Sequence, residues 1–210
     1  MKKIAMLVLA GMFVAKGAAA DESSPVTTPQ DTSTSASTPV DPTKLAGNWG
    51  LETEVVWPLL PEVGIFTLKG THTLWGTPGG LRGDAIVGAY ARPNVSHDVV
   101  EKIDEYLGTV GYRQYVWKGL HAEVMTHIGW AGGTKNKIDG KDYSDLSWLL
   151  ETNVGYRVGF FEPGGIGTPG KVGFYLAPQA GMVAGIYTNI GPRESSDLFF
   201  TGKLIAGMSF

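Results

Sequence analysis

The chain has 210 residues, with 17 Lys and Arg against 20 Asp and Glu, a formal net charge of −3 and no cysteine. This length allows one or at most two domains, and the acidic balance argues against nucleic acid as a partner. The lack of cysteine excludes disulfide bridges and a lipid anchor on a cysteine, whereas 30 Gly, 6 Trp, 8 Tyr and 8 Phe favour β structure.

The first 20 residues have the pattern of a secretory signal peptide. Lys2 and Lys3 precede an apolar stretch over residues 4–15, and the small residues Ala18 and Ala20 are typical of a cleavage site. The stretch is shorter than the roughly 20 residues of a membrane-spanning helix. We therefore expect cleavage after Ala20, which removes three lysines and shifts the net charge from −3 to −6; an uncleaved anchor is the alternative.

Residues 21–44 are dominated by Ser, Thr, Pro and Asp. A segment with so few large apolar side chains cannot bury enough surface to offset the entropy of ordering. We expect a disordered linker in the periplasm, with a glycosylated stalk of the mucin type as the alternative. The folded domain is then expected over residues 45–210.

From residue 45 onward the sequence alternates, which is typical of strands because successive side chains point to opposite faces. In residues 146–161, for example, Trp148 and Val154 share a face opposite Glu151. Small residues occupy both faces of the third strand, so that strand fits either orientation. No apolar run is long enough for a membrane helix. The sequence predicts eight strands, at about residues 49–57, 66–74, 84–92, 110–117, 120–130, 146–161, 172–188 and 198–210.

Short and long connections are expected to alternate along the chain. Lys118 and Gly119 separate two alternating runs and predict a tight hairpin turn. Residues 96–107 have apolar side chains at helical spacing, so we expect a short amphipathic helix there. The other expected turns are residues 76–82 and 162–170, and the expected longer loops are residues 58–62, 93–108, 131–145 and 189–197.

Aromatic residues lie at the ends of the apolar faces. Trp148 and Phe160 are twelve residues apart, which projects to roughly 25–30 Å for a strand tilted near 40°. That separation matches a membrane-facing apolar band with an aromatic girdle at each edge. We predict a periplasmic girdle of Trp49, Trp75, Phe160, Phe174 and Phe210, and an outer girdle of Trp57, Trp130, Trp148 and Phe200. Trp75 is out of step with its strand and needs a strand end or a bulge to face lipid.

The opposite faces of the same strands carry charges of both signs. An eight-stranded barrel has an interior just wide enough for side chains to fill it. Because an unpaired buried charge is costly, such charges must pair with one another. We therefore predict an antiparallel up-and-down transmembrane β-barrel of about eight strands whose lumenal polar network contains Glu52, Glu54, Lys69, Arg113, His121, Glu123, Glu151, Arg157 and Lys203.

The signal peptide, the alternating strands and the terminal Phe210 resemble the small outer-membrane barrels of the OmpA and OmpX type. The resemblance covers residues 45–210, and the Ser/Thr/Pro linker departs from it. It implies a monomer in the outer membrane of a Gram-negative bacterium, reached after secretion across the inner membrane and surrounded by outer-membrane lipid. It also implies that the barrel-assembly machinery recognises the aromatic strand that ends in Phe210.

Candidate catalytic and metal-binding residues are few. A lipid-modifying enzyme needs a nucleophile beside a base, and Ser147, His121, Glu123 and His127 are the available set. His121 and His127 are six strand residues apart, roughly 20 Å, which is too far to share one metal ion. A further loop holds three aspartates without the EF-hand spacing, and a solvated loop is the favoured interpretation over a weak Ca²⁺ site. These are Asp139, Asp142 and Asp145.

We therefore expect a non-enzymatic barrel without a catalytic, cofactor or metal site, with a structural or surface-interaction role in which outer loops contact ligand, host or lipid. Three alternatives remain open. One is a lipid-modifying outer-membrane enzyme, and another is a narrow, porin-like channel, although eight strands leave little open lumen. The third is a soluble secreted β-barrel or sandwich that binds a ligand.

Overall fold

The computed structural model describes residues 48–210 except residues 62, 77–79, 163–170 and 193–197. The predicted signal peptide and linker lie outside the described residues, as does most of the expected turn at 162–170. In the part of the chain that is described, no helix is long and apolar enough to cross a membrane.

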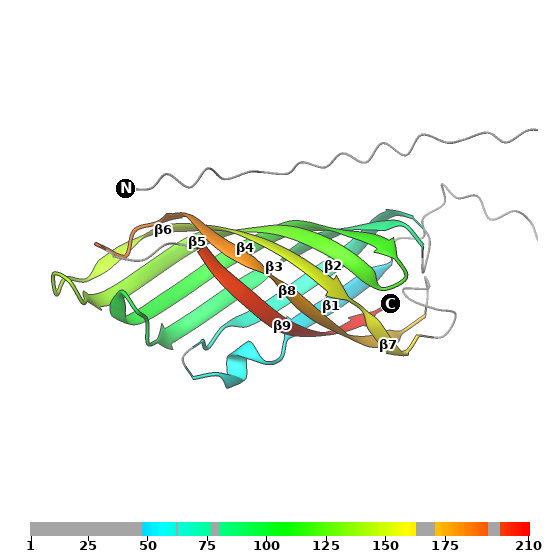
Figure 1. Cartoon of the computed structure of the whole chain (residues 1–210), viewed down its shortest axis with the longest axis horizontal. Helices are drawn as coiled ribbons and strands as arrows, with labels where there is room; N and C mark the ends of the chain where they lie inside the picture. The colour runs from blue at the N-terminus through cyan, green and yellow to red at the C-terminus, as the bar shows by residue number, and fades with distance from the viewer. Residues whose placement is uncertain (1–47, 62, 77–79, 163–170, 193–197) are drawn as a thin grey trace, which may run out of the picture. The chain divides into compact units, whose positions relative to one another are not determined.

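The described strands form one antiparallel sheet with up-and-down topology (Figure 1). A single 3-10 helix, η1 (Trp57–Leu59), follows the first strand. The strands are β1 (Trp49–Glu54), β2 (Phe66–Gly76), β3 (Arg82–Val95), β4 (Val100–Trp117), β5 (Leu120–Asn136), β6 (Tyr143–Tyr156), β7 (Val158–Phe161), β8 (Gly173–Thr188) and β9 (Leu198–Ser209).

The sheet closes on itself into a barrel. Strand β1 pairs with β2 on one side and with β9 on the other, and β6 likewise pairs with both β5 and β8. Strand β7 continues β6 after a break at Arg157 and pairs with the beginning of β8. The ring therefore has eight strands, one of them in two pieces, and the predicted antiparallel up-and-down barrel of about eight strands is confirmed.

The two faces of the wall differ as the alternation predicts. In β1, Trp49 and Leu51 are exposed, whereas Glu52 and Glu54, which follow them on the opposite face, are buried. The middle of the wall is apolar on its outside, with Val87 63% and Val110 59% exposed. This is the reverse of a water-soluble domain, because the charges are inside and the large apolar side chains are outside.

The barrel has two unlike ends, which we call the turn end and the loop end (Figure 1). The turn end carries the β2–β3, β4–β5 and β7–β8 connections and Phe210. The loop end carries the other four connections, and there β4 and β5, with 18 and 17 residues, extend beyond β1 and β2. A small apolar cluster packs within this extension, formed by Val95, Val99, Val100, Ile103, Ala131 and Ile190.

The expected helix at residues 96–107 is wrong, because residues 100–107 form the beginning of β4. Ile103, Glu105 and Leu107 are buried at alternate positions. This stretch pairs with β3 on one side and with β5 on the other. Hydrogen bonding to two neighbouring strands therefore favours a strand over the helix that the local spacing of apolar residues predicts. As a result, the predicted loops at 93–108 and 131–145 are shorter than expected.

Eight of the nine girdle aromatics lie exposed on the outer wall. Trp75 does so through a change of register between Thr73 and Trp75, the bulge that its position requires. Trp57 differs, because β1 ends at Glu54 and the Glu54 carboxylate accepts the backbone N–H groups of Val56 and Trp57. These bonds turn the chain into η1. The exposed eight are Trp49, Trp75, Trp130, Trp148, Phe160, Phe174, Phe200 and Phe210.

The predicted hairpin turn joins β4 to β5. Lys118 has a left-handed φ of 46°, and the strands resume pairing at Trp117 and Leu120. Gly119 is needed for close approach, because a Cβ there would overlap the carbonyl oxygen of Arg157. The Gly119 carbonyl also accepts the Arg157 backbone N–H at 2.9 Å, so the turn packs on the break between β6 and β7.

Replacing Gly119 with valine should destabilise the barrel, since overpacking at such a contact costs roughly 1–3 kcal/mol. Gly70→Ala is the control, because a Cβ there would meet no atom closer than 3.7 Å, and we expect a change within about 0.5 kcal/mol. Urea unfolding followed by tryptophan fluorescence measures both. Equal unfolding midpoints for the two variants would contradict the close packing of this turn.

Candidate functional site: the charged barrel interior

Arg113 on β4 lies at the centre of the interior and is only 1% exposed. Its guanidinium donates to both carboxylate oxygens of Glu52 across the barrel, at 2.5 and 2.7 Å. On its other side it contacts Glu123 on β5, at 2.8 Å from Nε and 2.7 Å from Nη2. A further N–H donates to the Tyr115 hydroxyl at 3.3 Å. Four of the five guanidinium donors therefore make hydrogen bonds, and Nη2 also lies within ion-pair distance of Glu123.

Lys69 completes a neutral set of four charges with Arg113, Glu52 and Glu123. Its Nζ lies 3.5 Å from Glu52 and 3.7 Å from Glu123. The Tyr175 hydroxyl donates to Glu52 at 2.5 Å. Two positive and two negative groups thus share one buried site, which we call the quartet. Such pairing offsets the cost of removing the charges from water.

A second group surrounds Glu151 on β6. Asn153 connects it to the quartet by donating to Glu123 at 3.0 Å and to Glu151 at 2.5 Å. Lys203 on β9 pairs with Glu151, and His127 Nε2 lies 3.2 Å from the same carboxylate. Strands that are distant in sequence are therefore joined across the interior by this carboxylate.

Acid–base pairs continue to the turn end. Arg82 donates to Asp84 at 2.9 Å and lies 4.3 Å from the centre of an aromatic ring, that of Tyr115. Arg157 pairs with Glu162, and its guanidinium lies 3.7 Å above the ring of Tyr175. Cation–π contacts of this kind add to the neutralisation by the carboxylates.

The loop end is closed in a similar way. Glu105 accepts from the Tyr90 hydroxyl at 3.3 Å and lies 3.8 Å from Arg92. Glu54 bonds to backbone instead, for its Oε1 also accepts the Leu204 N–H at 3.2 Å, whereas its Oε2 is buried without a hydrogen-bond partner among the described residues. Over the described residues, six interior carboxylates each meet a basic side chain; they are Glu52, Asp84, Glu105, Glu123, Glu151 and Glu162.

The loop after β1 folds over these interior groups. Trp57 donates from Nε1 to the Gly202 carbonyl at 2.7 Å, and the Lys203 ammonium lies 4.6 Å from its ring centre. Trp57 and Val63 pack against a buried cluster at the loop end. The cluster consists of Ile65, Tyr90 and Leu107.

All nine residues predicted for the lumenal network are buried in the interior. His121 is one of them, but it bonds to the Gly119 carbonyl at 2.9 Å and to Gln179 at 3.1 Å and pairs with no carboxylate. The sequence prediction missed further members. Arg82 and Glu105 fall in an expected turn and an expected helix, whereas Tyr175, Asn153 and Gln179 lie on the predicted inner face but carry no charge. Strict alternation along each strand is the signal for all five.

The structure does not assemble the candidate catalytic set. Ser147 hydrogen-bonds to Thr188 at 3.1 Å. His127 instead lies between the Thr109 hydroxyl, at 2.8 Å from Nδ1, and Glu151. This hydroxyl–imidazole–carboxylate order resembles a hydrolase triad, but Thr109 is 3% exposed inside the wall and Glu151 is also held by Lys203. The arrangement can relay a proton along the interior and offers no open face to a substrate.

The three aspartates of the loop predicted at residues 131–145 are held apart by separate partners, and Asp145 lies within β6. Asp139 accepts from the Tyr143 hydroxyl at 2.6 Å, a bond that lowers the pKa of this exposed carboxyl. Asp142 accepts the Lys135 N–H, and Asp145 accepts from the Tyr187 hydroxyl at 2.9 Å. Among the residues with described positions, no group of three or more ligating side chains gathers to hold a metal ion.

Comparisons of the chain with models of known protein families, with curated proteins and with solved structures find no match. Three features of the molecule bear on its function: the two unlike faces of the wall, the pairing of the interior charges and the difference between the two ends. Each of these can be tested in the protein itself.

Arg113→Met should lower the free energy of unfolding by about 3–5 kcal/mol, because it leaves Glu52 and Glu123 buried beside a single lysine. Lys135→Met breaks the exposed Lys135–Glu101 pair at 3.3 Å and should cost less than about 1 kcal/mol. Urea unfolding at neutral pH compares them. Similar costs for the two variants would show that the interior charges are solvated.

Proposed function

We propose that this chain is an integral outer-membrane β-barrel protein of a Gram-negative bacterium, with a structural or surface-interaction role and no catalytic function. The observation that carries the proposal is the inverted wall, which buries charges in paired groups and exposes large apolar side chains. A soluble barrel or sandwich would leave this apolar surface in water, where patches of such size lead to association.

The dimensions of the wall support a position in a bilayer. Strands β4, β5, β6 and β8 have 14 to 18 residues, more than the 9–11 or so that a tilted strand needs to cross the hydrocarbon core. The ring of backbone pairing is closed, so the wall has no open edge in lipid. The exposed aromatics at both ends fit the headgroup regions.

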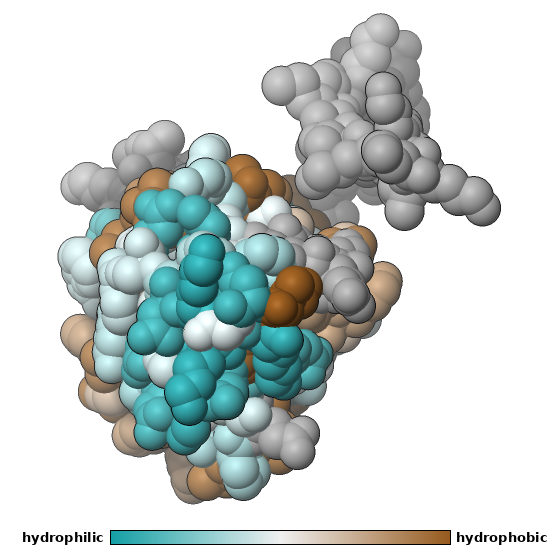
Figure 2. All heavy atoms as spheres, turned by 90° about the vertical axis from the view of Figure 1, so that its left-hand side faces the viewer, coloured by the Kyte–Doolittle hydropathy of each residue, from teal (hydrophilic) through white to brown (hydrophobic). Residues whose placement is uncertain are grey.

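The loop end supports a role at a surface. Hydrophilic side chains gather over the middle of this end, and hydrophobic residues lie around its sides (Figure 2). Asn136 donates to the carbonyls of Ile190 and Pro192 at 3.0 and 2.9 Å, which fixes one connection against another. A polar and firmly held end suits contact with a ligand, a host surface or lipid headgroups outside the cell.

The finer assignment, an OmpA- or OmpX-like monomer, is part of the same proposal. Phe210 is exposed on the outer wall and exchanges backbone hydrogen bonds with Trp49, at 2.8 and 3.0 Å. This exposed terminal aromatic suits recognition by the barrel-assembly machinery. The unassembled catalytic set and the closed interior favour this function over a lipid-modifying enzyme and over a channel.

Fractionation and gel migration test the proposal directly. We expect the mature protein in the outer-membrane fraction, extractable only with detergent, and migrating differently on a gel before and after boiling. A protein that stays in the aqueous periplasmic fraction and shows no heat-dependent shift would overturn the proposal and favour the soluble binding protein.

A charge introduced on the outer wall tests whether that wall faces lipid or water. Val87→Arg should destabilise the barrel in lipid vesicles by about 2–4 kcal/mol, since an arginine at mid-bilayer is costly. Ile138→Arg, at an equally exposed site in the β5–β6 connection, is the control and should change stability by less than about 0.5 kcal/mol. Urea unfolding in vesicles gives both values. Equal effects would place the wall in water.

The filled interior predicts a barrel that does not conduct ions. In planar bilayers the wild-type protein should give no current steps, whereas replacing the whole quartet with alanine should open a narrow path. That variant combines Glu52→Ala, Lys69→Ala, Arg113→Ala and Glu123→Ala, so it leaves no quartet charge unpaired. Regular steps from the wild-type protein would favour the channel instead.

A further inference from the structure

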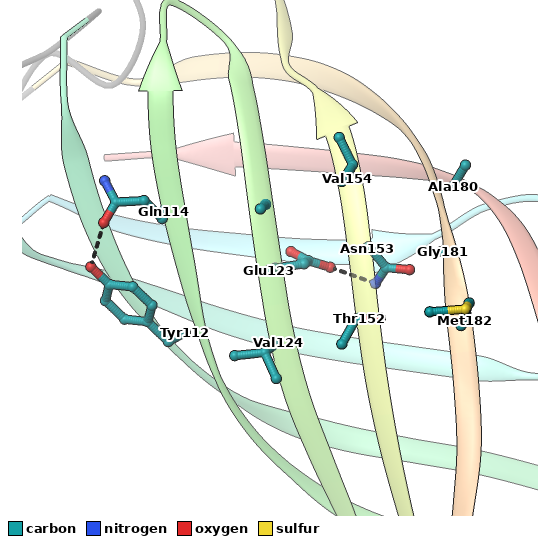
Figure 3. A pocket seen from close by; sticks show the side chains of 11 residues that line it. Tyr112, Gln114, Glu123, Val124, Thr152, Asn153, Val154, Ala180, Gly181 and Met182 are labelled. Atoms are coloured by element: carbon teal, nitrogen blue, oxygen red, sulfur yellow. Dashed lines mark hydrogen bonds between the residues drawn. The ribbon is translucent and has the colours of Figure 1, made fainter. Parts of the chain in front are cut away.

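The outer wall carries a groove of about 440 Å³ across β4, β5, β6 and β8 (Figure 3). Its floor follows a row of residues that pair across neighbouring strands, in which two alanines lie on either side of Val154. Ala122 pairs with Val154, Val154 with Ala180, and Ala180 with Gly202 on β9. A Cβ added to Gly202 would meet nothing within 4 Å, so the row remains open at that side.

Other outward-facing residues border the row on both sides. Toward the loop end lie Val124, Thr152, Met182 and Phe200, of which Phe200 is 83% exposed. Toward the turn end lies the pair of Leu120 and Tyr156. Residues on the same face are about 6.7 Å apart along a strand, so the two borders stand roughly 13 Å apart. The groove is thus a long, narrow, apolar valley.

The β4 end of the valley is polar. Gln114 pairs with Ala122 and therefore ends the row, and it accepts from the Tyr112 hydroxyl at 2.8 Å. Tyr112 in turn accepts from Trp75 Nε1 at 3.1 Å. Lys118 lies exposed in the adjoining turn, with its ammonium 5.0 Å from the ring centre of Trp117. One end thus offers polar groups and a positive charge, and the rest offers mainly apolar surface.

We propose that this valley binds one acyl chain of a glycerophospholipid from the leaflet at the turn end, with its phosphate near Lys118. The inference rests on the proposed function, because the wall must face lipid. Small side chains leave a hollow that neither water nor the protein fills favourably, and an alkyl chain matches its narrow apolar shape. The polar end with its nearby cation matches the headgroup of an amphiphile.

Native mass spectrometry tests the site on the full barrel, reconstituted in discs of one synthetic phosphatidylethanolamine and released in mild detergent. We expect one retained lipid on the wild-type protein and about tenfold less on Ala180→Phe, which fills the valley. Thr152→Leu is a milder filling variant that should lower retention in the same direction. Ala89→Phe, on the exposed wall of β3 outside the valley, should retain lipid as the wild type does.

Equal retention by all variants, or none by the wild type, would overturn the acyl-chain site. So would a pair of barrels in the wild-type spectrum that Ala180→Phe separates, because the occupant would then be a second copy. The heat-dependent gel shift of each sample distinguishes the two levels of inference. If the shift is present and retention is equal, only the lipid site fails; if the shift is absent, the membrane function itself fails.

Discussion

The neutralisation of Arg113 is the interaction on which the rest of the barrel depends. Its guanidinium makes four hydrogen bonds to Glu52, Glu123 and Tyr115, so one side chain from β4 holds together strands β1 and β5. Without that match, each buried charge would carry its full desolvation cost. Because the charges are paired, the interior forms a polar core. The middle of the outer wall is apolar.

This division reverses the usual source of stability. A soluble domain gains from burying apolar side chains, whereas here Val87, Val110 and their neighbours stay outside. The closed ladder of backbone hydrogen bonds and the matched interior charges must then specify one register for every strand. The two ends differ because β4 and β5 extend beyond β1 and β2 at the loop end, where hydrophilic side chains gather.

Much of this fold can be predicted from the sequence, because a strand with one apolar and one polar environment alternates between apolar and polar residues. Residues 146–161 and 172–188 alternate so regularly that their strands and inner faces follow directly. The turn at Lys118 and the bulge beside Trp75 follow as well. Residues 100–107 were misjudged because their apolar side chains fit a helical period, and only pairing with two neighbouring strands selects the extended form.

The interior partners could not be predicted in the same way. Glu52 and Arg113 are 61 residues apart, and their contact depends on the stagger of the whole ring. The outward turn of the chain at Glu54 was missed because it arises from a carboxylate that captures backbone N–H groups. Alternation along a strand predicts the face on which a charged side chain lies. Its ion-pair partner depends on how the strands are staggered in the closed ring.

The pairing of β1 with β9 has a consequence for how the chain reaches this state. The two strands join residues such as Glu54 and Leu204, which are 150 positions apart, and their pairing closes the ring of described strands. Until β9 arrives, β1 has an unpaired edge and the interior carboxylates face water or one another. Contacts of such long range form late and slowly. Closure of the ring therefore competes with aggregation of open sheets. A catalyst that holds β1 while β9 approaches would favour closure.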